Sequence, residues 1–292
     1  MSRSTYSLLQ RVAIKGRQVA YKNRVSEPYL SGAAFANLAD LVIRDEIDLK
    51  AFSELHLIPR VTFCRSDLVT QLQNKQVKQN SGQILIAGNG DFDFNDAASL
   101  PHGIFETFYL QNSSISDNKQ IFTLPIGVEN LSLGINGLPK NLVSTQDWKT
   151  KSKKVMVGPF SSTHEERQEL LKKAGDSEGV FQIVEGPISP GRFAKLMLHF
   201  RYVACPRGNG MDTHRFWEAL YRGSVPVVKR SKWSESLLTL KIPLVIVEDW
   251  DETPNAIEAF EKSFTGFNPK KIEALWIGYW RKKLAKTNLV SN

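Results

Sequence analysis

Residues 203–228 read VACPRGNGMDTHRFWEALYRGSVPVV, and this stretch decides the fold. A short apolar run leads into a glycine-containing loop, then into a helical pattern over 213–222 and a second apolar run over 225–228. This order is typical of a βαβ unit whose two strands lie parallel in one sheet. Ligands bind to such sheets beyond the carboxyl ends of the strands, where loops lead into helix N-termini.

The same alternation continues on both sides of this stretch. We expect strands at 155–157, 180–184, 202–205 and 244–247, and helices at 164–174 and 190–200. Earlier in the chain, the apolar runs 84–87 and 121–126 read as buried parallel strands, whereas residues 1–80 give few clear signals. The sequence therefore predicts an α/β protein with two Rossmann-like lobes, at 1–150 and 151–268, joined by the lysine-rich stretch 149–154.

Residues 269–292 form a third segment, predicted as a basic amphipathic helix that crosses back onto the first lobe. Its apolar side is formed by Ile272, Leu275, Trp276, Tyr279 and Leu284. Either this side packs on the body of the protein, or it rests on an anionic membrane surface.

Composition and charge narrow the class of protein. The chain has 292 residues, 41 % of them hydrophobic, and it lacks the roughly 18–20 consecutive apolar residues that a membrane span requires. Because residues 1–6 are polar and basic, we expect a cytosolic protein that can rest on a membrane. The net charge of +8 favours an anionic partner: nucleic acid, membrane or diphosphate. The two distant cysteines, Cys64 and Cys205, are predicted to be buried free thiols.

The helical stretch after the glycine loop has two different sides on a helical wheel. One side is apolar and suits packing on a sheet: Phe216, Ala219, Leu220 and Gly223. The other side is charged: His214, Arg215, Glu218 and Arg222. A charged side on so apolar a helix needs a partner, which is either an internal ion-pair network or a bound ligand.

A diphosphate would satisfy that need. Asp212 or Thr213 would cap the helix, whose free N–H groups favour an anion. Arg207 could hold the same anion with two parallel hydrogen bonds, and Gly208 lets the backbone approach closely. From inside the helix, the carboxylate of Glu218 could accept hydrogen bonds from ribose hydroxyls.

The segments 206–208, 212–220 and 223–228 resemble the donor-site signature of exostosin-type glycosyltransferases. Their later part is also similar to fucosyltransferases that use GDP-fucose. The resemblance is specific over some 25 residues and diffuse over 82–265, and residues 1–80 show none. It implies the GT-B fold, with two Rossmann-like domains facing a cleft. It also implies that Thr163 and Arg167 help to hold the donor. In the transfer itself, Arg207, the helix start near Asp212 and His214 would stabilise the charge that develops on the leaving diphosphate, although His214 could equally cap or pack.

The acceptor side is predicted from residues 88–93, which follow a buried strand. An inverting transfer needs a base that takes the proton of the acceptor hydroxyl. Asp91 is our first candidate for this base and Asp93 the second. The pair also fits the Asp-X-Asp pattern with which a different transferase fold holds a metal, but the basic residues near 207 offer charge compensation without one, so no metal or other cofactor is expected.

These observations together predict an inverting glycosyltransferase. The donor would be a nucleotide-diphosphate sugar, with UDP-sugars favoured, and the acceptor a glycan. The alternatives are a GDP-fucose-dependent fucosyltransferase and a non-catalytic protein that binds anions or nucleic acid. Nucleic acid is disfavoured because no recognised nucleic-acid-binding module occurs in the sequence.

Overall fold

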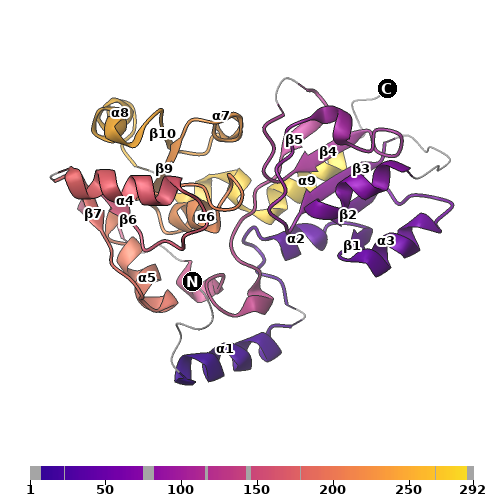
Figure 1. Ribbon diagram of the computed structural model, residues 1–292, viewed down its shortest axis with the longest axis horizontal. Helices are drawn as coiled ribbons and strands as arrows, with labels where there is room; N and C mark the ends of the chain where they lie inside the picture. Colours follow the sequence, from indigo (N-terminus) through magenta and orange to yellow (C-terminus); the bar gives the residue numbers. More distant parts are fainter. Residues whose placement is uncertain are drawn as a thin grey trace.

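The computed structural model describes residues 8–22, 24–74, 82–115, 118–142, 146–177, 179–266 and 268–287. Its strands form two five-stranded parallel sheets, one in each half of the chain. Each sheet and the helices on its faces form a lobe, and the two lobes lie side by side (Figure 1). The predicted α/β fold with two Rossmann-like sheets, consistent with the GT-B type, is confirmed.

The first lobe is built on a sheet whose strands follow the order of the sequence. They are β1 (Leu41–Ile43), β2 (Val61–Arg65), β3 (Ile84–Gly88), β4 (Thr107–Leu110) and β5 (Ile121–Thr123). Its helical elements are α1 (Leu8–Ala20), α2 (Gly32–Ala36), α3 (Glu46–Ser53), η2 (Ser66–Asn74), η3 (Ala97–Ser99), η4 (Leu131–Leu133) and η5 (Pro139–Asn141). The sequence predicted β3 and β5, but it did not predict β1, β2 or β4.

Strand β3 shows why this sheet is buried on both faces. Ile84 and Ile86 pack in the same apolar cluster as residues of α2 and α9 (Ile277–Lys286). Leu85 and Ala87, which point the other way, pack with residues of α3 and η2. An apolar residue at every position is therefore required, as is typical of parallel sheets covered on both sides.

The second lobe has the strand order β10-β9-β8-β6-β7. Its strands are β6 (Ser152–Val157), β7 (Phe181–Ile183), β8 (Phe200–Ala204), β9 (Val225–Lys229) and β10 (Val245–Val247). Its helical elements are η6 (Trp148–Thr150), α4 (Glu166–Asp176), α5 (Pro190–Met197), α6 (His214–Tyr221), α7 (Lys232–Leu238), η7 (Trp250–Glu252) and α8 (Thr253–Glu261). All the strands and helices predicted for this lobe are present, with ends shifted by a few residues.

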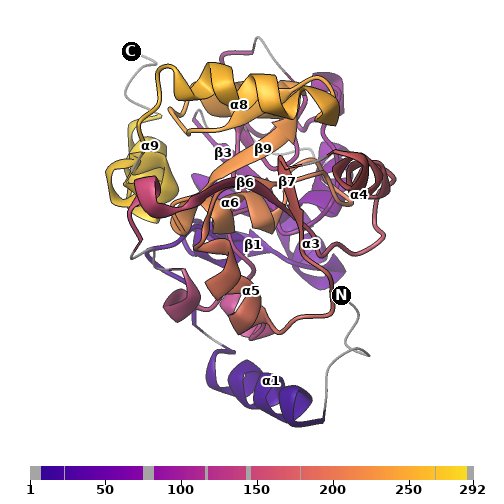
Figure 2. The same cartoon turned by 90° about the vertical axis from the view of Figure 1, so that its left-hand side faces the viewer.

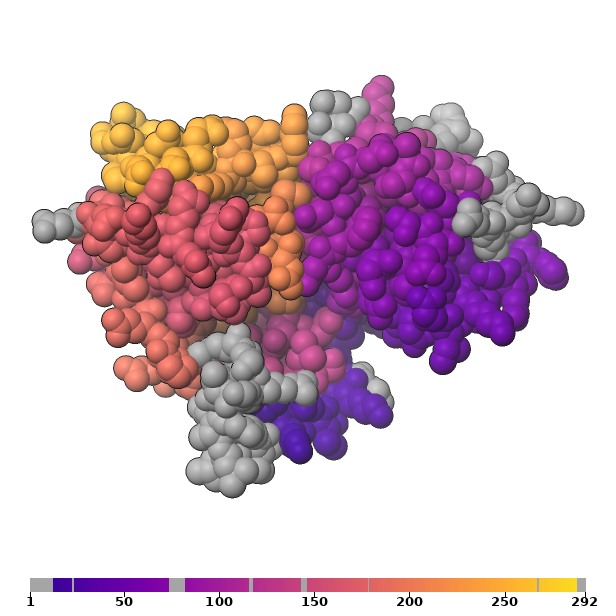
Figure 3. Space-filling model, viewed as in Figure 1, coloured from indigo at the N-terminus to yellow at the C-terminus, as the bar shows by residue number. Residues whose placement is uncertain are grey.

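One apolar cluster joins the two lobes. It contains Ile86 and Tyr109 from the first sheet, and Phe216 and Trp217 from α6 of the second lobe. A separate cluster on the far side of the second sheet packs against α4 and α8. In the space-filling view the lobes meet along a continuous seam (Figure 3). The lobes are thus packed on each other through apolar side chains.

The C-terminal segment crosses back onto the first lobe, as predicted, but it is not one helix. It consists of η8 (Pro269–Lys271), η9 (Glu273–Leu275) and α9, because Ile272 and Trp276 have extended backbone. Residues 288–292 lie outside the described residues. The Arg60 side chain donates to the carbonyl of Leu284 at 2.7 Å, and Trp280 is fully buried. The apolar side of α9 therefore packs on the protein, which corrects the alternative of a membrane-facing helix.

The lysine-rich stretch 149–154 is not a free linker. It spans the end of η6 and the start of β6. Lys151 is buried, and its Nζ donates to the carbonyls of Arg222 and Gly223 at 2.7 and 2.8 Å. A cation next to the last carbonyls of a helix is stabilising, so Lys151 closes the C-terminal end of α6.

The structure also shows the state of the cysteines, the lengths of the helices and the position of α1. Cys64 and Cys205 are buried free thiols, as predicted. None of the helices described is long and apolar enough to cross a bilayer. Seen from the side, α1 projects from the rest of the molecule below α5 (Figure 2), and it is attached to the body by hydrogen bonds such as Arg17 Nε to the Gly134 carbonyl at 2.7 Å.

Candidate functional site

A pocket of about 390 Å³ lies between the two lobes. It opens beyond the carboxyl ends of β6 and β8, where the rule for open α/β sheets places ligands. The first lobe contributes Asp91, Ile126, Glu129, Ile135 and Asn136. The second contributes Pro159, Phe160, Ser161, Thr163, Arg167, Ile188, Pro190, Phe193, Pro206, Gly208, Asn209, Gly210, Asp212, Thr213, His214, Arg215 and Glu218. Most of the sequence-predicted site residues therefore line a single pocket.

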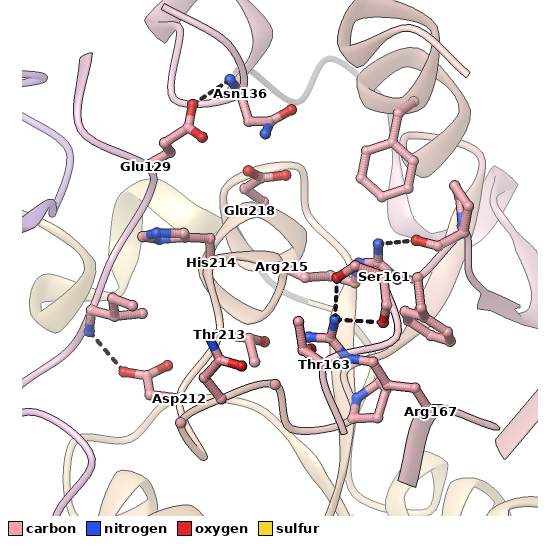
Figure 4. Close-up of a pocket in the computed structure, with 18 of the residues that line it drawn as sticks. Glu129, Asn136, Ser161, Thr163, Arg167, Asp212, Thr213, His214, Arg215 and Glu218 are labelled. Atoms are coloured by element: carbon pink, nitrogen blue, oxygen red, sulfur yellow. Dashed lines mark hydrogen bonds between the residues drawn. The ribbon is translucent and has the colours of Figure 1, made fainter. Parts of the chain in front are cut away.

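The pocket has a cationic side and an acidic side. Figure 4 shows Ser161, Thr163, Arg167 and Arg215 together on one side. Glu129, Asn136 and Glu218 gather on the other side of the same space. A ligand that fits this pocket would thus carry negative charge at one end and hydrogen-bond donors at the other.

Arg215 is the central cation of the pocket. Its guanidinium carbon lies 4.4 Å from the ring centroid of Phe160 and 5.0 Å from that of Phe193. Nη2 donates to the Pro159 carbonyl at 2.6 Å, whereas Nη1 is buried and has no hydrogen-bond partner among the described residues. Burial lowers the pKa of Arg215 to about 10, so the group is still charged at neutral pH. The side chain holds a positive charge and a free N–H beside the pocket.

Arg167, at the start of α4, lies beside Arg215 (Figure 4). Nε donates to the Arg207 carbonyl at 2.9 Å, and Nη1 donates to the carbonyl and hydroxyl of Ser161 at 3.1 and 2.8 Å. Burial lowers the pKa of Arg167. A Cβ at Gly208 would come within 2.7 Å of Nη2 of Arg167 and 3.5 Å of Thr163 Oγ1. A larger residue at 208 would therefore displace the end of the Arg167 side chain from the loop.

Arg207, which the sequence analysis predicted to hold the diphosphate, does not line the pocket. Its Nη2 pairs with Asp93 across the lobes at 3.1 Å, each side chain being about one-third exposed, and neither residue lines the pocket. Nε of Arg207 and Oδ1 of Asp93 are buried and have no hydrogen-bond partner in the described part of the chain. Asp91 does line the pocket, as an exposed residue that accepts from Asn209 Nδ2 at 2.9 Å. The two aspartates thus tie loop 206–212 to the first lobe.

Asp212 and Thr213 do not cap α6 with their side chains. Thr213 is the N-cap residue, with extended backbone and no side-chain cap hydrogen bond. The Asp212 carboxylate, 3 % exposed, accepts from Ile126 N and from Trp217 Nε1, both at 2.7 Å. Burial raises the pKa of Asp212 to about 7. The prediction that Asp212 caps the helix is wrong: its carboxylate joins α6 to the first lobe, which leaves the first N–H groups of the helix free of side-chain caps.

The acidic side of the pocket is fixed by local partners. Glu218 Oε2 accepts from Arg222 Nη1 at 3.1 Å, and both side chains are nearly fully buried. Glu129 Oε2 accepts from the backbone N–H of Asn136 at 2.7 Å. In Glu218 and in Glu129, one carboxylate oxygen thus accepts a hydrogen bond from within the protein, and both residues line the pocket. The predicted ion-pair alternative therefore holds for part of the charged side of α6.

His214 connects the two lobes at the pocket wall. Its Nδ1 lies 2.8 Å from the carbonyl oxygen of Gly127, in the loop after β5. Gly127 has a φ of +68°, and a Cβ there would come within 2.3 Å of the Leu30 carbonyl. Only glycine allows this turn, which brings the carbonyl to the histidine.

Several pocket residues were not identified from the sequence. Ile188, Phe193 and Asn136 lie on segments without a motif. Ile188 and Phe193 belong to the second lobe, whereas Asn136 comes from the first lobe and reaches the pocket through the packing of the lobes. Buried Asn112, in the left-handed region at a φ of 54°, accepts from Asp212 N at 2.9 Å and thereby orients loop 206–212. In the part of the chain that the structure describes, no three His, Cys, Asp or Glu side chains lie close enough together to hold a metal ion.

The comparisons with known proteins give distant likenesses among solved structures. No protein-family model matches the chain, and no curated protein matches it. The resemblance to exostosin-type enzymes therefore depends on the sequence motif. Among solved structures, the crystal structure of an α1,3-fucosyltransferase is similar at 12 % identity and a TM-score of 0.38, over 84 % of this chain and 88 % of that one.

Proposed function

We propose that this protein is an inverting glycosyltransferase of the GT-B type. It would move a sugar from a nucleotide-diphosphate donor, with UDP-sugars favoured, to a glycan acceptor. The observation that carries this proposal is Arg215: a half-buried arginine whose Nη1 is buried without a hydrogen-bond partner among the described residues, on the first turn of a helix, in a pocket between two Rossmann-like sheets. A pyrophosphate is the group that best satisfies such a position.

The donor would bind against the second lobe, residues 151–268. Arg215 and Arg167 would contact the diphosphate, next to the N–H groups of the first turn of α6. Thr163 and Gly208 line the same side of the pocket. Glu218, four residues further into α6 than His214, would accept hydrogen bonds from the ribose hydroxyls through the oxygen not paired with Arg222.

The acceptor would approach from the first lobe, residues 1–150, with the described part of the C-terminal segment, 269–287, packed on that lobe. Transfer would be a single displacement in which the acceptor hydroxyl attacks the anomeric carbon and the diphosphate leaves. Asp91 is the predicted base that reaches the pocket, whereas Asp93 faces Arg207 outside it. The arginines would stabilise the charge that develops on the diphosphate, and we propose that no metal is needed.

Two alternatives lead to different ligands. A GDP-fucose-dependent enzyme would use the same pocket with a different base and sugar. Binding of a nucleic acid is disfavoured at this pocket, because Asp91, Glu129 and Glu218 lie in its wall and would repel a polyanion.

The test is nucleotide binding followed by transfer. UDP, GDP, CDP and ADP are titrated into the protein while thermal unfolding is monitored, since a ligand at about 100 times its dissociation constant adds about 2.7 kcal/mol to stability. The nucleotide that binds selects the series of nucleotide sugars whose release of nucleoside diphosphate is then measured with simple glycoside acceptors. If no nucleoside diphosphate binds, and binding to oligonucleotides falls steeply with salt, the proposal is refuted in favour of nucleic-acid binding.

A further inference from the structure

The tautomer of His214 is set by its partner. A backbone carbonyl can only accept a hydrogen bond, so the contact of 2.8 Å to Gly127 places the ring proton on Nδ1. In the neutral ring Nε2 then carries a lone pair. Within the described residues Nε2 has no hydrogen-bond partner, and His214 is one of the residues that line the pocket. A histidine oriented in this way by a hydrogen bond to its other nitrogen is the arrangement that general-base catalysis uses.

The position of the ring is fixed from both lobes. His214 is the first residue of α6, directly before Arg215. Its partner Gly127 belongs to the loop of the first lobe, which is held by a hydrogen bond from Val128 N to the Leu30 carbonyl at 2.8 Å. The imidazole therefore sits at the boundary where a donor bound by the second lobe would meet an acceptor bound by the first.

The carboxylates of the site are less suited to this role. Asp93 is paired with Arg207 outside the pocket, and Asp91 lies beside Asn209, next to the loop that contacts Arg167. An anionic base at the arginine side would be repelled by the diphosphate that these arginines bind. A neutral imidazole is not repelled, and the positive charge that it gains is offset by the charge on the leaving diphosphate.

We infer that Nε2 of His214 is the base of the reaction, an inference that rests on the proposed function. The acceptor hydroxyl oxygen forms the new bond to the anomeric carbon. The bond from that carbon to the phosphate oxygen breaks, and its electron pair leaves with the nucleoside diphosphate. The hydroxyl proton moves to Nε2 and is later released to solvent. His214 is thus a catalytic residue in addition to forming the wall of the donor site.

The experiment separates the proton-accepting nitrogen from the interlobe hydrogen bond. In His214→Asn the side-chain amide nitrogen takes about the place of Nδ1, so the bond to the Gly127 carbonyl is kept while Nε2 is lost. Release of UDP or GDP from the nucleotide sugar that the wild type uses should fall by about 10²- to 10⁴-fold. Binding of the same nucleoside diphosphate should change by less than about threefold. His199→Asn, at an exposed histidine outside the pocket, should leave both unchanged.

A second variant tests for base chemistry directly. His214→Ala opens space at the ring, and added imidazole should restore part of the lost rate without changing nucleotide binding. The inference is overturned if His214→Asn keeps transfer within about threefold of wild type, or if His214→Ala does not respond to imidazole while Asp91→Asn abolishes transfer. Failure of the proposed function has a different outcome: the wild type itself would bind no nucleoside diphosphate.

Discussion

The replacement of Arg215 by methionine tests whether the pocket binds a diphosphate. The methionine side chain is of similar length and can fill the space between the rings of Phe160 and Phe193. The change removes the charge, the free Nη1 and the hydrogen bond to the Pro159 carbonyl. It also removes the cost of burying a cation, which the lowered pKa of Arg215 indicates. Because these effects oppose one another, the free energy of unfolding should change by no more than about 1 kcal/mol.

The effect on ligand binding should be much larger. A hydrogen bond to a charged group contributes roughly 1.5–3 kcal/mol. Since 1.4 kcal/mol is a factor of ten in affinity, the dissociation constant for the nucleoside diphosphate should rise about 10- to 150-fold. The free nucleoside, which has no phosphate, should bind the variant and the wild type equally.

Isothermal titration calorimetry at one fixed salt concentration measures both affinities. Arg230→Met is the matched control, because Arg230 is an exposed arginine that pairs with Glu235 and Glu248 outside the pocket. It should leave the affinity unchanged. If Arg215→Met weakened nucleoside diphosphate binding by less than about threefold, with the fold intact, the assignment of the diphosphate to this arginine would be refuted.

Three further predictions concern the architecture of the site. Glu218→Ala leaves the buried guanidinium of Arg222 without its carboxylate and should lower the free energy of unfolding in urea by about 3 kcal/mol, whereas Glu218→Gln should cost less. Gly210→Ala places a Cβ 2.3 Å from Nδ2 of buried Asn112, so it should cost about 1–3 kcal/mol in the same assay and also weaken nucleotide binding. Asp212 has a folded-state pKa raised from 3.8 to about 7, so the folded state binds a proton that the unfolded state releases between these values. Stability should therefore fall as the pH rises from 3.8 to about 7, and this part of the pH dependence should be absent in Asp212→Asn.

The second lobe could be predicted well because its signals are local. Its strands are short apolar runs, and each is followed by a helix with one apolar side, as in 214–221. The first lobe was harder to predict, because β1 has three residues and β2 includes Thr62 and Cys64 within its apolar run. The β propensity of so few residues is a weak signal. β2 is defined by its pairing with β3, and β1 by its pairing with β2.

In the candidate site, too, residues with local signals could be predicted from the sequence, whereas contacts between the lobes could not. Residues of one loop and one helix, such as Gly208 and Arg215, could be assigned to a pocket from their order along the chain. The partners of Arg207 and His214 could not, because Asp93 and Gly127 come from the other lobe. Which atoms meet there depends on how the two sheets pack, and no pattern of nearby residues determines that. A contact between the lobes thus holds Arg207, the main donor-site arginine in the sequence prediction, beside Asp93 and outside the pocket.

The packing of α9 on the first lobe has a consequence for folding during translation. Trp280 packs against Phe35 and Tyr109, which are synthesised long before it. At a translation rate of about 5–20 residues per second, the aromatic groove that receives Trp280 stays open for seconds to tens of seconds after β5 has been made. The N-terminal half of the growing chain therefore leaves Phe35 and Tyr109 without their final aromatic partner until α9 has been synthesised.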